Sequence, residues 1–399
     1  MIDPDEALQL VLENAKPGQA SRVPLDEACG LRLAEAVRAD RDYPPFVRAM
    51  MDGYAVRSED AGRAVIIAAQ VAAGHEAAVR VAAGRCAEIM TGAPCPPGTE
   101  AVTAKERARR DGARVVLPEA IAAGDGIAAQ GSECRAGSVV ASPGERITPL
   151  VVAVLATVGV RTVCVLPRPS LAVITTGPEL VPPDRQPSTA QIRDSNGPML
   201  VAMARGMGLP GPLHLHADDT VGAIVQALQR ASDRAIVVLT GGVSEGAYDL
   251  VPKALETFGA EIIFHKVRQK PGKPLLFARK ASQLFFGLPG NPLAAHLGFH
   301  RYVAAAVRRM TGEAPAPEPS LGRLAAPVQA DGQRTRFVLS RARRDPPDST
   351  GWQVHPLNSA TSADLFSPSG ANCYLWVPPG ERGLEAGAVV PFVWIGDAE

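Results

Sequence analysis

The sequence predicts a multidomain α/β protein, in which a doubly wound, mostly parallel α/β sheet domain is joined to β-rich and helical domains. A chain of 399 residues is longer than one hydrophobic core usually organises, so several domains are expected. In the middle of the chain, apolar runs alternate with amphipathic stretches of helical period, which is typical of a parallel sheet covered by helices. Short β-like runs broken by glycine and proline lie on either side.

The composition restricts the possible partners and ligands. The 41 basic and 41 acidic residues balance, so no overall charge attracts nucleic acid or a membrane surface. The six cysteines are scattered without a Cys-x-x-Cys pair, which argues against zinc and favours a reducing cytoplasm. His214 and His216 alternate on a predicted strand, but the sequence offers no third ligand, and we predict no metal site there. Without a signal-peptide pattern or a long apolar run, we expect a soluble cytoplasmic protein.

Two segments far apart in the sequence predict one discontinuous helical domain, residues 1–40 and 141–168. The first begins with "MIDPDEALQLVLENAKPG", which has the period of a short amphipathic helix. The second contains "TPLVVAVLATVGV", a compact apolar helix that we expect to pack back on the N-terminal helices. Residues 41–140 predict a β-rich domain, because short runs such as "VAAGHEAAVRVAAGRC" lack a long helical period.

Residues 169–314 predict the α/β sheet domain. Apolar runs such as "SLAVITTG" and "AIVVLTGG" have the length and the terminal glycines of buried strands, while "TVGAIVQALQRAS" and "LVPKALETFG" have the period of amphipathic helices. The proline-rich "GEAPAPEPS" follows as a linker. Residues 315–399 hold short β runs such as "RFVLSRA" and "CYLWVP", and they predict a small C-terminal β-barrel domain.

The stretch "PPFVRAMMDGYAV" joins two prolines to an Asp-Gly turn. Pro44 and Pro45 fix the backbone dihedral φ and remove two hydrogen-bond donors, so this arm should run extended as far as Asp52 and Gly53. One interpretation is a hairpin turn in which Asp52 caps its own backbone. The other is that a stiff arm presents the Asp52 carboxylate to a site elsewhere.

Three glycine-containing loops follow predicted strands of the α/β domain: "TTGPEL", "TGGVSEG" and "GLPGNP". The carboxyl ends of parallel strands meet at one edge of a sheet, where ligands usually bind. Glycines such as Gly241 and Gly242 let backbone amides approach an anion, and a following helix N-terminus adds partial positive charge. Pro289 and Pro292 make the third loop rigid. Each loop alone could be an ordinary turn, but together they favour a phosphate-type ligand.

Acidic residues accompany these loops: Glu179, Asp218, Asp219 and Asp249. Asp219 stands where the N-cap of the next helix is expected, which leaves Asp218 without a structural role. Glu179 could be a first-turn acid that complements a helix dipole. Alternatively, such carboxylates hold Mg²⁺ against a bound phosphate, because this ion prefers oxygen ligands.

The stretch "HKVRQKPGKP" supplies the opposite charge. On a strand, Lys266, Arg268 and Lys270 would share one face, and the following Pro-Gly turn would bring Lys273 beside them. Such a stripe is either a solvated strand face or a site for an oxyanion.

Taken together, these motifs resemble one known family, the molybdopterin molybdenumtransferases, which include MoeA and the gephyrin E domain. The motifs that carry the resemblance occur in the expected order and are "PPFVRAMMDGYAV", "IMTGAPCPPG", "TTGPEL", "QIRDSN", "TGGVSEGAYDLV", "KPGKPLLF" and "FFGLPGNP". They span nearly the whole chain, and their combination is highly specific although no single motif is. The resemblance implies four domains, with a MogA-like α/β domain that binds molybdopterin, and an elongated homodimer.

The resemblance also implies an activity, namely molybdenum insertion into adenylylated molybdopterin during molybdenum cofactor biosynthesis. In that reaction the adenylyl linkage is hydrolysed with Mg²⁺, AMP leaves, and molybdate provides the metal. Position by position, the implied catalytic residues are Asp52, Thr91, Glu179, Asp218 and Asp249, of which Glu179 and Asp218 would lie nearest the metal ion. The implied cofactor-binding residues are Gly241, Gly242, Ser244, Lys270, Lys273, Pro289, Pro292 and Ser362.

In the implied homodimer, the stiff arm would carry Asp52 into the cleft of the partner subunit. The other partners implied are the small-molecule substrates and the molybdopterin adenylyltransferase that makes adenylylated molybdopterin. Neither nucleic acid nor a membrane is expected.

The chain departs from the family pattern at Val47, Ala49, Glu133, Pro178 and Leu339. The family usually has Asp, Ser, Asp, an acid and Arg at these positions, and Arg341 is a candidate to replace the guanidinium missing at Leu339. These departures support an alternative, a binding or scaffold paralogue whose activity has lapsed or changed, for example toward tungstate. A nucleotide-processing hydrolase is a third interpretation, but it would need neither the arm nor the last domain.

Overall fold

The computed structural model describes residues 1–76, 78–243, 250–344, 351–357, 359 and 361–396. The chain separates into two compact units. We call Met1–Ser21 with Val165–Glu399 the sheet unit, and Arg22–Cys164 the inserted unit. Each unit is described by itself.

The sheet unit is built on a mostly parallel sheet with the strand order β17-β14-β18-β22-β21-β19. The first four of these run parallel, while β21 and β19 are antiparallel to their neighbours. Every residue of β14 and of β18 is buried, because helices cover both faces of the sheet. The doubly wound sheet predicted from the sequence is therefore confirmed. Its strands are β14 (Leu171–Thr176), β17 (Leu213–Ala217), β18 (Ile236–Thr240), β19 (Glu261–His265), β21 (Leu276–Lys280) and β22 (Gln283–Leu288).

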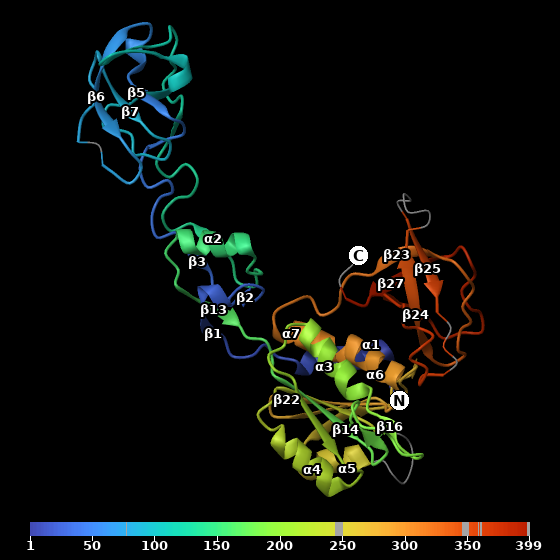
Figure 1. Ribbon diagram of the computed structural model, residues 1–399. Helices are drawn as coiled ribbons and strands as arrows, with labels where there is room; N and C mark the ends of the chain where they lie inside the picture. Colours follow the sequence, from blue (N-terminus) through green and yellow to red (C-terminus); the bar gives the residue numbers. More distant parts are fainter. Residues whose placement is uncertain (77, 244–249, 345–350, 358, 360, 397–399) are drawn as a thin grey trace. The chain divides into compact units, whose positions relative to one another are not determined.

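Two sets of helices cover the opposite faces of this sheet (Figure 1). On one face, α1, α3, α6 and α7 bury apolar side chains against the strand residues Val173, Val238 and Phe286. On the other face, α4 and α5 pack on Ile174 and Leu239. The helices are α1 (Pro4–Asn14), α3 (Asn196–Gly206), α4 (Val221–Arg230), α5 (Leu250–Phe258), α6 (Pro292–Gly298) and α7 (Ala304–Met310), and the π-helical turn η4 (Phe299–Val303) joins the last two.

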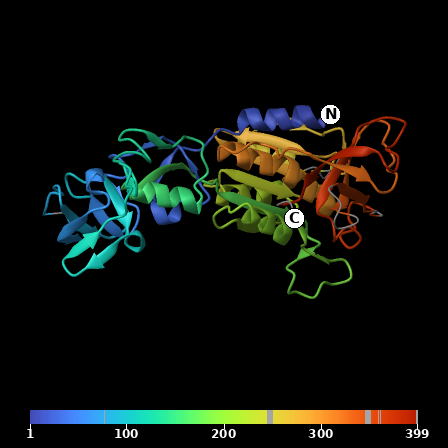
Figure 2. The ribbon, with the colours of Figure 1, turned by 90° about the horizontal axis from the view of Figure 1, so that it is seen from above.

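The N-terminal helix α1 is not part of a helical domain with the segment 141–168, which corrects the prediction from the sequence. Its capping box is formed by Asp3 and Glu6, and its apolar face, with Ala7 and Val11, packs in the core of the α/β sheet. Figure 2 shows α1 lying along α7. Residues 22–40 contain short strands and a 3-10 turn instead of a helix. The helical period was read correctly, but an apolar face does not reveal which surface it will cover.

The C-terminal part of the sheet unit is a small barrel. Its strands lie in the order β20-β24-β25-β23-β27-β26, and a further pairing of β24 with β26 closes it. The core of the barrel includes Val354, Leu375 and Phe392. Strand β20 (Gln269–Lys270) comes from the α/β segment and pairs with β24, so it joins the two domains directly. The other strands are β23 (Ser320–Leu324), β24 (Thr335–Arg343), β25 (Trp352–Pro356), β26 (Cys373–Val377) and β27 (Val389–Trp394).

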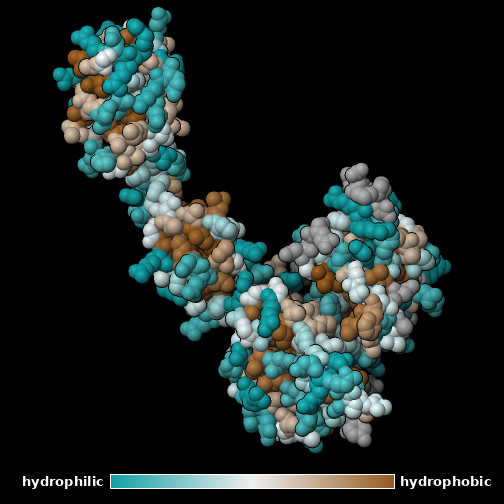
Figure 3. All heavy atoms as spheres, in the orientation of Figure 1, coloured by the Kyte–Doolittle hydropathy of each residue, from teal (hydrophilic) through white to brown (hydrophobic). Residues whose placement is uncertain are grey.

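The inserted unit contains a β-sheet with the order β8-β5-β7-β6-β10-β9 and a smaller sheet with the order β1-β13-β2. Helix α2 (Pro149–Thr157) packs near the smaller sheet, and its Leu150 side chain is 76% exposed. Apolar side chains gather on the surface over α2 (Figure 3). The sheet strands are β5 (Gly53–Val56), β6 (Ala64–Val71), β7 (Arg85–Ile89), β8 (Ala101–Ala104), β9 (Arg109–Asp111), β10 (Arg114–Val116), β1 (Ser21–Pro24), β2 (Arg32–Leu33) and β13 (Thr162–Leu166).

Short strand pairs complete the two units: β3 (Val37–Arg38) with β12 (Val139–Ala141), β4 (Arg48–Ala49) with β11 (Ile127–Ala128), and β15 (Leu180–Val181) with β16 (Ile192–Arg193). Among the helices that the structure describes, none has the length and apolar character needed to span a membrane.

Candidate functional site

The carboxyl ends of β14, β17, β18 and β22 lie level with one another. Thr176 pairs with Ala217, Thr175 with Thr240, and Thr240 with Leu288. The loops that follow these strands therefore meet along one edge, which we call the carboxyl edge. The expectation that "TTGPEL", "TGGVSEG" and "GLPGNP" share one location is confirmed for their described residues, which exclude residues 244–246 of the second loop.

Glycine allows the loops of the carboxyl edge to touch. Gly241 has a φ of 98°, and a Cβ atom on it would lie 2.6 Å from Thr176 Oγ1, so no larger residue fits without strain. Gly242 also has a positive φ, and a Cβ on Gly290 would lie 3.7 Å from the Cα of Gly241. The Thr240 hydroxyl donates to the Pro289 carbonyl at 3.1 Å, which ties the second loop to the third.

Asn196 is a residue at this edge whose side chain the sequence analysis did not single out. Its amide nitrogen donates to Thr240 Oγ1 at 3.0 Å and to the Gly290 carbonyl at 2.7 Å. Its oxygen Oδ1 is buried and has no hydrogen-bond partner among the described residues. A buried acceptor without a donor is costly unless a ligand or water completes it, so Asn196 is a candidate ligand contact. The motif "QIRDSN" was a signal that could have identified it.

Glu179 and Asp218 follow adjacent strands and are both exposed at the carboxyl edge. The Glu179 carboxylate folds back over Gly177, because a Cβ on Gly177 would lie 2.4 Å from Glu179 Oε2. No helix begins at Glu179, since the short strand β15 follows, so the proposed interaction with a helix dipole is wrong.

The N-cap assigned to Asp219 is also wrong. Thr220 is the N-cap of α4, and its hydroxyl accepts from the Ala223 amide at 3.1 Å. Asp218 and Thr220 are linked through their backbones, because the Thr220 amide donates to the Asp218 carbonyl at 2.7 Å. Both aspartates are exposed, so their carboxylates are available to a ligand.

The described residues contain no cluster of three or more His, Cys, Asp or Glu side chains that could hold a metal ion. Two carboxylates on neighbouring strands still suit Mg²⁺, which commonly binds one or two carboxylates together with phosphate oxygens and water. That Glu179 and Asp218 bind a metal ion stays a prediction. Asp249 and Ser244 lie outside the described residues.

His214 and His216 share one face of β17, as expected, and both ring systems approach Thr175 Oγ1, at 3.3 and 3.5 Å. His214 also contacts the Asp194 carboxylate at 3.3 Å, and Asp194 accepts from the Gly197 amide at 2.9 Å. Burial raises the pKa of Asp194, but the hydrogen bonds from His214 and Gly197 outweigh it, and the net pKa is lowered. This cluster holds the start of α3 against the sheet.

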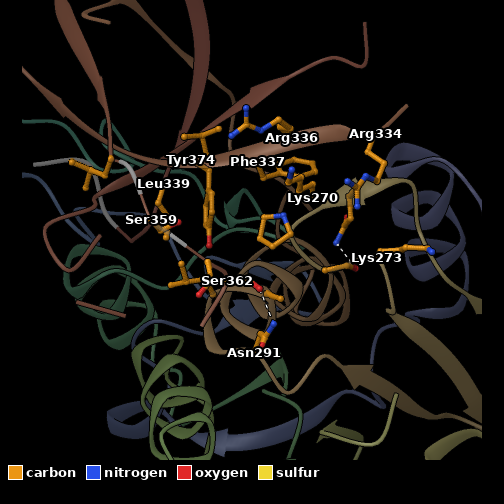
Figure 4. A pocket seen from close by; sticks show the side chains of 18 of the residues that line it. Lys270, Lys273, Asn291, Arg334, Arg336, Phe337, Leu339, Ser359, Ser362 and Tyr374 are labelled. Carbon is orange, nitrogen blue, oxygen red and sulfur yellow. Dashed lines mark hydrogen bonds between the residues drawn. The ribbon is translucent and has the colours of Figure 1, made fainter. Parts of the chain in front are cut away.

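A second feature of the sheet unit is a pocket of about 600 Å³ between the α/β domain and the barrel. We call it the cationic pocket, because Lys270, Lys273, Arg334 and Arg336 line it and none of its described lining residues is acidic (Figure 4). The remaining lining comes from parts of residues 269–274, 289–294, 327–339 and 356–362, and from Tyr374.

Asp331, beside the pocket, organises two of these cations. Its carboxylate lies 2.8 Å from Arg334 Nη2 and 3.6 Å from Lys270 Nζ. The hydrogen bond from Arg334 is the main cause that lowers the pKa of Asp331 to about 2. Asp331 thus stays ionised and holds the Arg334 and Lys270 side chains near one another.

The uncharged side of the pocket contains Asn291, Ser362 and Tyr374 (Figure 4). Asn291 Nδ2 donates to Ser362 Oγ at 2.7 Å, and the Leu293 amide donates to the Ser362 carbonyl at 3.1 Å. The Tyr374 hydroxyl is 2.7 Å from Nδ1 of His296, which projects from α6. Burial, followed by the neighbouring His300, lowers the pKa of His296 to about 4, so this imidazole is neutral.

The predicted basic stripe on a single strand is wrong. Strand β19 ends at His265, and Lys266 has a φ of 78°, which interrupts the extended chain before Lys270. Lys270 and Lys273 nevertheless line the same pocket. Of the other residues predicted to bind the cofactor, Pro289 and Ser362 also line it, whereas Pro292 is the first residue of α6.

Leu339 lines the cationic pocket, but Arg341 is exposed and is not among its described lining residues. The prediction that Arg341 replaces a guanidinium at this site is therefore wrong. Arg334 and Arg336, which the sequence analysis missed, bring guanidinium groups to the pocket instead. Their signal was the "RTR" triplet at the start of β24.

In the inserted unit, Asp52 and Thr91 form one cluster. Asp52 Oδ1 accepts from the Thr91 amide at 2.8 Å and from the Thr91 hydroxyl at 2.7 Å. These two hydrogen bonds lower the pKa of Asp52, with a smaller contribution from Lys105. The Asp52 side chain therefore bonds to another loop rather than to its own turn. Among the departures from the family pattern, Glu133 pairs with Arg48 at 2.7 Å.

Comparison with family models accounts for most of the chain. Residues 2–159 match the MoeA N-terminal region, described as domains I and II. Residues 172–309 match a probable molybdopterin binding domain, and residues 322–395 match the MoeA C-terminal region, domain IV.

Curated relatives and solved structures agree with these matches. The chain is 31% identical to a molybdopterin molybdenumtransferase of Staphylococcus epidermidis, over 98% of this chain and 95% of the relative. It is 32% identical to a molybdopterin molybdenumtransferase of Staphylococcus aureus, over 97% of this chain and 94% of that relative. A crystal structure of a molybdopterin biosynthesis MoeA protein from Pyrococcus horikosii superposes with a TM-score of 0.86 at 26% identity, covering 100% of both chains.

Proposed function

Because this chain belongs to the MoeA family of molybdenum cofactor biosynthesis, we propose that it inserts molybdenum into adenylylated molybdopterin and releases AMP. The substrates are then molybdate and adenylyl-molybdopterin. The observation that carries the proposal is the cationic pocket, whose lysines and arginines come from two domains and whose described lining is free of carboxylates. A doubly charged tetrahedral oxyanion suits such a lining, because it accepts hydrogen bonds and needs compensating positive charge.

The carboxyl edge provides the second half of the proposed site. Its loops come into contact through Gly241 and Gly242, whose φ values are positive, and the buried Asn196 Oδ1 lacks a donor among the described residues. We assign the pterin and phosphate groups of adenylyl-molybdopterin to this edge. Phosphate chemistry of this kind depends on charge neutralisation and on the position of the attacking water more than on a covalent nucleophile.

Glu179 and Asp218 are the residues that we propose hold Mg²⁺ against the phosphate. The ion would neutralise the charge that develops on the phosphate oxygens. The two carboxylates orient the phosphate and the water beside it, while Lys270 and Lys273 keep molybdate in the pocket.

We further propose a homodimer in which Asp52 and Thr91 of one subunit serve the site of the other. The low pKa of Asp52 keeps its carboxylate ionised and able to position water or the pterin. The molybdopterin adenylyltransferase, which makes the substrate, is a proposed partner on chemical grounds, because direct transfer would protect the labile adenylyl linkage.

The test is an AMP-release assay. The full chain is incubated with adenylyl-molybdopterin, Mg²⁺ and either molybdate or tungstate, and AMP is measured by chromatography. We expect AMP release that depends on molybdate. Release with tungstate alone would reassign the metal, and no release with either oxyanion would support a scaffold paralogue.

Asp218→Asn separately tests the proposed role of the carboxylates at the carboxyl edge. The substitution keeps the size of the side chain at an exposed position, so the fold should remain intact, while AMP release should fall roughly 10- to 100-fold because a metal-binding charge is lost. Asp219→Asn is the matched control, since Asp219 is equally exposed but is not assigned to the site. Equal activities of the two variants would remove Asp218 from the site.

A further inference from the structure

Asn291 occupies the position of a helix cap but does not cap the helix. It is the N-cap residue of α6, where asparagine is favoured because its side-chain oxygen can accept from an amide of the first turn. No such bond forms between Asn291 and the described first turn. The side chain reaches across to the barrel instead, where Nδ2 donates to Ser362 Oγ at 2.7 Å (Figure 4).

The direction of this hydrogen bond determines what Ser362 can offer. An amide nitrogen only donates, so Ser362 Oγ uses a lone pair on Asn291 and its own proton must point elsewhere. The Leu293 amide also donates to the Ser362 carbonyl at 3.1 Å, which fixes the serine backbone against the start of α6. Because Asn291 and Ser362 both line the cationic pocket, the serine proton can be directed to an anion bound there.

The cationic side chains of the pocket favour the same kind of ligand. Lys270, Lys273, Arg334 and Arg336 have only donors, and the oxygen and the nitrogen of the Gln269 amide each already have a partner, Tyr302 and Gly272. Molybdate and sulfate carry no proton near neutral pH and act purely as acceptors. Hydrogen phosphate carries a proton that needs an acceptor, and the described lining contains no carboxylate to receive it.

We propose that Asn291 is a positioning residue that fixes the Ser362 hydroxyl as a hydrogen-bond donor to a tetrahedral oxyanion, and so favours oxyanions without a proton over hydrogen phosphate. The inference rests on the proposed function, since that function puts molybdate in the cationic pocket.

A double-mutant cycle tests the inference. Dissociation constants for molybdate and for phosphate are measured by calorimetry on the full chain and on Asn291→Ala, Ser362→Ala and the double variant. We expect each single substitution to weaken molybdate binding roughly tenfold, as loss of one charge-assisted hydrogen bond does. The double variant should bind no more weakly than Ser362→Ala, because Asn291 acts through the serine.

Asn291→Asp tests the direction of the bond. A carboxylate only accepts, so it would draw the Ser362 proton toward itself and turn the serine lone pairs to the pocket. The ratio of molybdate affinity to phosphate affinity should therefore fall in Asn291→Asp by more than in Asn291→Ala. A role in folding alone would not change this ratio.

His300→Ala is the matched control. His300 Nε2 donates to the Trp394 carbonyl at 2.9 Å and so joins the same two domains, but His300 is not among the described residues that line the pocket. An equal loss of molybdate affinity in His300→Ala would mean that any loosening of the contact between the two domains weakens molybdate binding. That result would overturn the inference. Additive losses in the double variant, or an unaltered affinity in Asn291→Ala, would overturn it while the proposed function stands. Failure of the unaltered protein to bind molybdate would overturn both.

Discussion

At the scale of single residues, the Asp52 carboxylate shows how the inserted unit keeps an exposed acid ionised. Thr91 donates to the same carboxylate oxygen twice, once from its amide and once from its hydroxyl. Hydrogen bonds to the charged form of an acid favour that form and lower its pKa. The charge of Asp52 is therefore preserved without burial, which leaves its other oxygen for a partner.

Thr91→Val should raise the pKa of Asp52 part of the way to its ordinary value. Valine keeps the shape and the amide of threonine but lacks the hydroxyl, so one of the two bonds that lower the pKa is lost. The measurement is a pH titration of the carboxyl carbon signals by NMR. Thr99→Val is the control, because the Thr99 hydroxyl donates to the Pro96 carbonyl and not to an acid. An unchanged pKa of Asp52 in Thr91→Val would contradict the assignment.

The sequence allowed some site residues to be predicted and not others, for local reasons. Lys270 and Lys273 lie in the motif "KPGKPLLF", whereas Ser362 was carried over as a single position. The structure brings all three to one pocket, although their roles stay predictions. Arg334 and Arg336 were missed because the pocket wall that they form depends on how the barrel packs on the α/β domain. The N-cap error arose because aspartate and threonine are both good cap residues, and adjacent positions cannot be distinguished by residue type.

At the scale of the elements, the turn after β18 depends on Gly241. Its positive φ and its contact with Thr176 leave no room for a side chain. Gly241→Ala should destabilise the protein by about 1–3 kcal/mol, the usual cost of a strained backbone conformation. Urea unfolding measures the change. Gly206→Ala, at the end of α3 where a Cβ would meet nothing within 4 Å, should be neutral or stabilising. Equal stabilities of the two variants would show that the turn can relax.

Helix α6 joins the α/β domain to the barrel through a histidine that must remain neutral. His296 has a pKa of about 4 in the folded protein and an ordinary value of 6.5 in the unfolded chain. Between these values the unfolded state binds a proton that the folded state does not, so stability falls as the pH drops from 6.5 toward 4.

His296→Gln should make the free energy of unfolding less sensitive to pH over this range. A shift of one pKa unit corresponds to about 1.4 kcal/mol, so the difference is measurable by urea unfolding at pH 7 and pH 5. Glutamine can still form a hydrogen bond with Tyr374, which preserves the contact. His216→Gln is a suitable control, since His216 is exposed. The same pH dependence in His296→Gln and in the unaltered protein would contradict this account.

Elements were predicted well where burial leaves a strong pattern. The strands β14 and β18 appear as continuous apolar runs because both of their faces are covered, and the glycines that end them were visible. The segment after β14 was not predicted, because "GPEL" suits a turn before a helix as well as a turn before the short strand β15. The N-terminal helix was predicted, but its packing partner was not.

At the scale of the whole molecule, the proposed homodimer makes a prediction about mixed subunits. Asp52→Asn and Asp218→Asn should each lower AMP release roughly tenfold or more when either variant is assayed alone. When the two variants are dissociated and reassociated together, half of the dimers are mixed, and one of their two sites contains both intact aspartates if the site is shared between subunits. About one quarter of the normal AMP release should return. No recovery, although mixed dimers form, would mean that each site is built within one subunit.

The packing of α1 also has a consequence for the order in which the protein matures. Helix α1 is synthesised before the inserted unit, but its partner α7 ends only at Met310, after that unit. At 5–20 residues added per second, α1 waits roughly 15–60 s for that partner. During this time the inserted unit can already fold, while the apolar stripe of α1 stays uncovered on the nascent chain. Helix α1 is thus made before the inserted unit but reaches its packing partner only after that unit is complete.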